Sequence, residues 1–391
     1  SNLNKTIDEL FNIFSTITQT NYSADDLNIL DASTNLIINA SAVTSLTGSA
    51  SALVNAYTSS GISGLGDETA TISDTSIEAS LLNTLDENTT GIINASTVNT
   101  LTGSASDINS ALSSDGISNL SNQAITISNT SIDASLLNTL DENTNGVINA
   151  STVNTLTGSV SDINSALSSD GISNLNNQTI TITNTSIDAS LLNTLDENTT
   201  INLNANSVSS LTGNASDLIT AYSSSGISGL GNEAVIINLG TSSVSSANIL
   251  SEATSGVVTA TLSDEDMETL KGLKGKKNAY SIAISDNAVD SSLLIALDGK
   301  TIALISASKV ESLTGTAYDL SKVYSSSEIS GLGNETLTIT DTSIEASLLN
   351  TLDGHTTGVI NASTVNTLTG SESDINAALS SDEISDGESE L

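Results

Sequence analysis

Residues 75–120, TSIEASLLNTLDENTTGIINASTVNTLTGSASDINSALSSDGISNL, decide the fold. The same stretch returns at residues 130–175 with four substitutions. A segment that recurs with so few changes is typical of a repeat protein, in which each copy is one structural unit that stacks on its neighbours. The chain is therefore expected to be one array of similar units and not a set of unrelated domains.

Two leucine landmarks define the period of the array. One belongs to a TLD-like corner, at Leu30, Leu85, Leu140, Leu195, Leu250, Leu297 and Leu352. The other belongs to an LTG-like corner, at Leu46, Leu101, Leu156, Leu211, Leu270, Leu313 and Leu368. Successive landmarks are 55 residues apart except around the fifth copy, so the sequence predicts seven repeats, one of them divergent.

Each copy contains stretches typical of both strands and short helices. TATIS at 69–73 and GIINA at 91–95 have the β-branched pattern of strands. Short helices are expected after a capping box that begins at Thr75, after Ser96 and after Ser106. Strands joined through a helix pair in parallel, because parallel neighbours need a long crossover. We predict an α/β solenoid of seven repeats, each about 55 residues long, with a continuous parallel sheet. A parallel β-helix is the alternative, because Ser, Thr and Asn are poor helix formers.

The predicted organisation is an N-terminal segment, residues 1–22, followed by a single solenoid over 23–391. Apolar residues from Leu3 to Ile17 recur at helical spacing. The first segment is therefore either an amphipathic helix that caps the open end of the solenoid or a diverged half-repeat. The divergent fifth repeat lies around 240–290.

Charge composition limits the possible partners. Eight Lys and no Arg face 45 acidic residues, which gives a net charge of −37. This charge disfavours nucleic acid and anionic membranes, because binding to both depends on clustered basic residues. No apolar run approaches the ~20 residues that span a bilayer, so membrane insertion is not expected. The Asp, Asn, Ser and Thr oxygens in the turns make calcium binding possible, although no known calcium-loop motif is present.

Catalytic motifs are not evident in the sequence. His355 is the single histidine and there is no Cys, so neither a catalytic triad nor an imidazole-based metal site can form within one chain. Acidic pairs such as Asp86 and Glu87 recur in several copies, whereas an active site is normally single. We expect no enzyme activity, no catalytic residues and no cofactor.

The fifth repeat carries the most asymmetric feature of the array. Seven of the eight lysines lie between residues 271 and 322, and four replace a Ser/Thr-rich segment: Lys271, Lys274, Lys276 and Lys277. One interpretation is a drifted copy with a solvated basic loop. The other is a docking patch for an acidic face of a second copy, in a head-to-tail contact that propagates.

The repeat phrasing resembles that of giant extracellular proteins of marine bacteria. SSGISGLGDETATISDTSIEASLLNTLDENTTGIINASTVNTLTGSASD resembles repeats of large cell-surface proteins of marine cyanobacteria and of long adhesin-like proteins, and the resemblance covers residues 23–385. It implies an extracellular or surface-displayed protein that serves as a stalk, filament or surface-layer element. Its expected partners are itself or cell-surface components. The alternatives are a calcium-dependent adhesin and a phage-fibre binding module.

Overall fold

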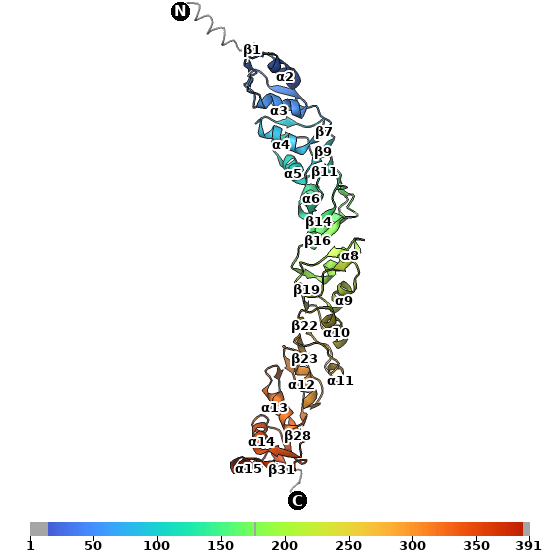
Figure 1. Ribbon diagram of the computed structural model, residues 1–391, viewed down its shortest axis with the longest axis vertical. Helices are drawn as coiled ribbons and strands as arrows, with labels where there is room; N and C mark the ends of the chain where they lie inside the picture. Colours follow the sequence, from blue (N-terminus) through green and yellow to red (C-terminus); the bar gives the residue numbers. More distant parts are fainter. Residues whose placement is uncertain (1–14, 176, 386–391) are drawn as a thin grey trace, which may run out of the picture. The chain divides into compact units, whose positions relative to one another are not determined.

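A computed structural model describes residues 15–175 and 177–385. Helices and short strands alternate along this range (Figure 1), as expected for an α/β solenoid. The described residues form two compact units. One runs up to Thr183 and includes Leu195–Leu203, and the other comprises Asn184–Thr194 and the residues from Asn204 onward. The N-terminal helix predicted over residues 3–17 lies almost entirely outside the described residues.

The helices are short, as predicted, and most contain eight to ten residues. They are α2 (Ala24–Ser33), α3 (Ala50–Thr58), α4 (Ala79–Glu87), α5 (Ala105–Ser113), α6 (Ala134–Glu142), α7 (Val160–Ser168), α8 (Ala189–Glu197), α9 (Ala215–Ser223), α10 (Val244–Ala253), α11 (Met267–Leu270), α12 (Ser291–Asp298), α13 (Ala317–Ser325), α14 (Ala346–Asp353) and α15 (Glu372–Leu379).

Strands of the first unit form parallel sheets whose neighbours come from successive coils. The first three sheets are β1 (Ser15–Thr16), β3 (Ile38–Asn39), β5 (Ile62–Ser63); β2 (Asn21–Ser23), β4 (Ser45–Gly48), β6 (Thr69–Ile72), β8 (Ile93–Asn94), β10 (Ile117–Ser118); and β7 (Ser76–Glu78), β9 (Thr100–Gly103), β11 (Ala124–Ile127), β13 (Ile148–Asn149), β15 (Ile172–Ser173). Three further strands pair in order, β12 (Ser131–Asp133), β14 (Thr155–Gly158) and β16 (Thr179–Ile182).

The second unit repeats this arrangement. Its sheets are β17 (Ser186–Asp188), β19 (Ser210–Gly213), β21 (Ala234–Ile237), β22 (Val258–Thr261), β23 (Ala279–Ala283), β25 (Ile305–Ser306), β27 (Ile329–Ser330); β24 (Ala288–Asp290), β26 (Ser312–Gly315), β28 (Thr336–Ile339), β30 (Ile360–Asn361), β32 (Ile384–Ser385); and β29 (Ser343–Glu345), β31 (Thr367–Thr369). The remaining short strands are β18 (Leu203–Asn204) and β20 (Ile227–Ser228).

One coil of the solenoid is shorter than one sequence repeat. Leu101 pairs with Ile77 on one side and Ile125 on the other, so the chain advances one strand every 24 residues there (101 − 77 = 24). The 55-residue repeat therefore contains two coils, each with one helix, such as α4 and α5. The similarity between the two halves of the repeat has this structural cause.

The predicted continuous sheet is divided into overlapping parallel sheets. Every second coil has an additional strand directly before its helix, as β12 precedes α6, and this strand begins a new sheet. Neighbouring coils in the first unit are consequently joined by two ladders from two different sheets, for example β8 with β10 and β9 with β11. The prediction of a solenoid with parallel strands and short helices is confirmed, whereas its single sheet is not.

The landmark leucines form the core, as the period predicts. Leu85, Leu101, Leu140 and Leu156 are fully buried, and the equivalent leucines of later repeats are buried as well. Only the first and the last landmark, Leu30 and Leu368, are half-buried. A solenoid coil covers the apolar edge of its neighbour, so the ends of the array are the least covered.

Two local predictions are wrong. The helix expected after Ser96 is a turn closed by a hydrogen bond from Val98 N to Ala95 O, and it leads into β9. The capping box expected at Thr75 is absent, because Ser76–Glu78 form strand β7, which pairs with β9, and α4 starts afterwards. In both places parallel pairing with the next coil determines the backbone conformation instead of local helix propensity.

Helix N-termini connect one coil to the next. Ser104 caps α5 by accepting a hydrogen bond from Asp107 N at 3.1 Å. The first helical N–H, of Ala105, donates to Asn129 Oδ1 in the following coil at 2.8 Å. Asp74 accepts in the same way from Ala50 N. The Asp or Asn after each longer strand therefore satisfies a donor that a helix leaves open.

Candidate functional site

The lysine-rich segment follows the four-residue helix α11 and precedes β23. It makes a turn in which Gly275 and Lys277 adopt left-handed conformations, with φ of 80° and 62°. A non-glycine residue pays an energetic cost in this conformation, so its neighbours must fix the turn. The side chain of Tyr280 in β23 is fully buried below it.

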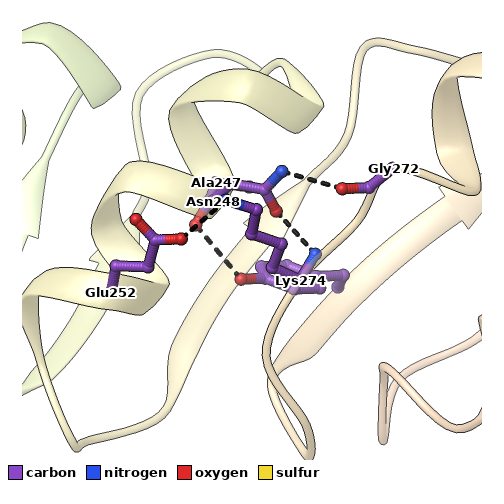
Figure 2. A network of polar contacts seen from close by, with 6 residues as sticks. Ala247, Asn248, Glu252, Gly272 and Lys274 are labelled. Atoms are coloured by element: carbon purple, nitrogen blue, oxygen red, sulfur yellow. Dashed lines mark hydrogen bonds and ion pairs between the residues drawn. The ribbon is translucent and has the colours of Figure 1, made fainter.

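Asn248 of α10 fixes this turn (Figure 2). Its Oδ1 accepts from Lys274 N at 2.7 Å, and its Nδ2 donates to Gly272 O at 2.9 Å. Lys274 Nζ lies 2.8 Å from Glu252 Oε1, one helical turn further along α10. The buried Tyr280 hydroxyl donates to Ala247 O at 3.4 Å.

The four predicted docking lysines fall into two classes. Lys271 pairs with Glu268 at 2.5 Å, and Lys274 pairs with Glu252, so both bind carboxylates of their own chain. Lys276 and Lys277 are exposed and form no ion pair within 15–175 and 177–385. Exposed pairs contribute at most about 1 kcal/mol, so the first two lysines act mainly on the turn, and only the last two carry a free charge.

A second set of polar residues recurs at buried corners and was missed from the sequence. Glu68, Glu233 and Glu335 are each 1% exposed. Glu233 accepts from Gly231 N at 2.9 and 3.0 Å and from the hydroxyl of Tyr222. Glu335 likewise accepts from Gly333 N at 2.8 Å and from the Tyr324 hydroxyl. These contacts satisfy a buried charge without any cation.

Two other repeats use a neutral version of the same corner. Gln123 Nε2 donates to Val98 O at 3.2 Å and to Asn119 O at 2.8 Å, while its Oε1 accepts from Asn122 N. Gln178 makes the same bonds in the next repeat. Eleven positions earlier, the Glu repeats carry Tyr and the Gln repeats carry Leu: Tyr57, Tyr222 and Tyr324 against Leu112 and Leu167. This pairing within one chain was the available sequence signal.

His355 lies beside one of these corners. Its ring stacks on Tyr324, with centroids 5.1 Å apart and planes at 4°. The side chain is exposed, as the sequence suggested for a loop histidine. Within the described residues, no group of three or more His, Cys, Asp or Glu side chains is placed to hold a metal ion. The described helices also include none with the length and apolar character needed to cross a bilayer.

Alkaline pH should destabilise the chain through Tyr57. Burial raises the pKa of its hydroxyl to about 12, and the charges of Glu68 and Asp67 act in the same direction. The folded state therefore holds this proton more tightly than the unfolded state, whose tyrosine pKa is about 10. The associated stability is complete below pH 10 and is lost as the pH rises through 12.

The measurement is the melting temperature from about pH 9 to about pH 12. Tyr57→Phe should flatten the fall of the melting temperature above pH 10. Tyr318→Phe is the matched control, because Tyr318 is 61% exposed and should leave the profile unchanged. Equal profiles for Tyr57→Phe and the unmodified protein would contradict the assignment.

Comparisons with known proteins add little to this geometry. No family model matches the chain, and no curated protein matches it. Among solved structures, a chain in the crystal structure of the Rad7 and Elc1 complex in yeast is similar over 94% of this chain and 83% of its own length, at 11% identity. The TM-score is 0.18, and a similarity at that level supports no conclusion about this chain.

Proposed function

We propose that the chain is a structural, extracellular repeat protein that serves as a stalk, filament or surface-layer element and associates with itself head to tail. One observation carries the proposal: equivalent leucines are buried repeat after repeat, so the conserved purpose of each copy is to stack on the next. In such an array each unit depends on its neighbours and adds length. The surface resemblance of the repeats supports an extracellular location.

Electron microscopy and sedimentation of the purified chain test this proposal. We expect concentration-dependent growth into fibres or sheets at low ionic strength. The net charge of −37 opposes association overall, so growth should depend on contacts between opposite charges. Isolated particles that remain monomeric at every concentration and salt level would contradict self-association and leave only a tethered spacer.

A calcium-dependent adhesin is the second candidate, with a phage-fibre module as its variant. The observation that favours it is the pairing of carboxylates in two late repeats. Asp298 and Glu328 both accept from the Ser326 hydroxyl, at 2.8 and 3.3 Å. Asp353 and Glu383 share Ser381 in the same way. Carboxylates brought this close attract a hard cation.

Calcium titration followed by thermal melting separates the two candidates. Under the structural proposal the melting temperature should change by less than about 2 °C, because a ligand that does not bind the folded state cannot stabilise it. A saturable rise of several degrees that Glu328→Gln and Glu383→Gln abolish would favour the adhesin. Magnesium serves as the control cation, since it demands a stricter geometry than calcium.

A further inference from the structure

One exposed aliphatic residue recurs directly before the short strand in six of the seven repeats. The residue after it is fully buried in each case, as Ile93 follows Ile92, so strand alternation points the preceding side chain outward. In the first unit these residues are Ile37, Ile92 and Val147, and in the second they are Val257, Leu304 and Val359. They are 42–58% exposed. We call each set of three the aliphatic row of its unit.

Acidic residues flank the aliphatic row of the first unit. Ile93 pairs with Ile117 and Ile148 pairs with Ile172, which places Gly116 and Gly171 opposite the row. The residues before these glycines, Asp115 and Asp170, are exposed. The part of this unit that the structure describes contains no basic side chain, because its residues include no Lys and no Arg.

Lysines flank the aliphatic row of the second unit. Val258 N donates to Asn278 Oδ1 at 2.9 Å, and Asn278 forms a parallel bridge with Thr301. The residues before these two positions are Lys277 and Lys300, so both lie next to the row in adjacent coils. Neither forms an ion pair within the described residues.

More apolar surface widens this basic part of the row. Ile302 and Leu304 are 57% and 58% exposed, and Lys276 is exposed beside Lys277. Glu328 lies opposite Leu304, but it accepts hydrogen bonds from Ser326 and Ser327 of its own turn. The basic character is therefore confined to the coils from Val257 to Leu304.

We propose that the lysine-flanked row of one copy docks on the aspartate-flanked row of a second copy. The two surfaces have opposite charge, and both place aliphatic side chains two coils apart, which corresponds to about 10 Å. The contact is heterologous, because it joins different surfaces of two identical chains, so each added copy leaves one surface of each kind free for further growth. The inference rests on the proposed self-association and names the residues that perform it.

Charge reversal on each side tests the contact. We expect Lys277→Glu with Lys300→Glu to weaken association about 10-fold or more, because like charges then face each other. Asp115→Lys with Asp170→Lys should have the same effect. Mixing the two variants should restore assembly, since each variant then offers the charge that the other lacks. Sedimentation velocity at low and high salt measures all four samples.

Lys271→Gln with Lys274→Gln is the matched control, because these lysines pair with carboxylates of their own chain and should leave assembly unchanged. Melting curves establish that each variant is folded. If the unmodified chain assembles and folded Lys277 and Lys300 variants assemble equally well, the surface is wrong and the structural function stands. If the mixture does not recover assembly, the pairing is also wrong. If the unmodified chain never assembles, both proposals fail.

Discussion

Replacing Tyr222 by Leu together with Glu233 by Gln should cost far less stability than the two single changes added together. The pair copies the chemistry of Leu167 and Gln178 in the preceding repeat. Each single change instead leaves a mismatched buried group. Residues in one hydrogen-bonded network commonly show coupling energies of up to about 3 kcal/mol.

The single changes fail for different reasons. Tyr222→Leu removes a donor from a carboxylate that is 1% exposed, and a buried charge that loses its partner costs about 3 kcal/mol or more. Glu233→Gln places an amide nitrogen where a carboxylate oxygen accepted from Gly231 N, which leaves a donor facing a donor and costs about 2 kcal/mol. In the double variant the amide can turn toward backbone carbonyls, as Gln178 does.

Urea unfolding of the four proteins in this cycle measures the coupling. The reciprocal exchange, Leu112→Tyr with Gln123→Glu, provides the matched control in a repeat that uses the neutral corner. Both cycles should give a coupling of the same sign, about 2 kcal/mol in size. Additive single changes in both cycles would show that the recurrence of Tyr with Glu has no energetic basis.

Leu101→Ala should be among the most damaging single substitutions in the chain. Leu101 is fully buried in β9 between Ile77 of one neighbouring strand and Ile125 of the other. Removing a buried leucine costs about 3 kcal/mol, partly through lost transfer energy and partly through the cavity that remains. The loss should spread to both neighbouring coils, because each covers part of the other's apolar edge.

Leu368→Ala is the same chemical change at the last landmark and should cost about 1 kcal/mol. Leu368 is half-buried, and its strand β31 pairs with β29 on one side within the described residues. Urea midpoints of the two variants against the unmodified chain check this difference. Equal losses would mean that position in the array does not determine how much each landmark contributes.

The period and the core could be predicted from sequence because they depend on residue type at a fixed spacing. Leu85 and Leu101 are apolar in a chain rich in Ser, Thr and Asn, so their recurrence identifies the stacked face. Local conformation was less predictable. Val98 and Leu101 are three residues apart, which fits one turn of helix, yet they belong to a turn and a strand whose partners lie 24 residues away, as Leu101 with Ile77 shows.

The candidate site shows the same limit. Sequence position alone grouped Lys271, Lys274, Lys276 and Lys277 as one patch. Their difference comes from Glu252 and Glu268, which fold against two of them. Lys300 lies next to Lys277 only because Asn278 bridges to Thr301 in the adjacent coil. Contacts of this kind depend on strand register, which residue composition does not specify.

The staggered sheets have a mechanical consequence. In the first unit, two neighbouring coils are held by ladders of two sheets that end at different places. A tear that unzips one five-stranded sheet runs out after four junctions (5 − 1 = 4), where a different sheet already spans the gap. Pulled from its ends, such a chain should yield in small separate steps and not by one crack that travels its whole length.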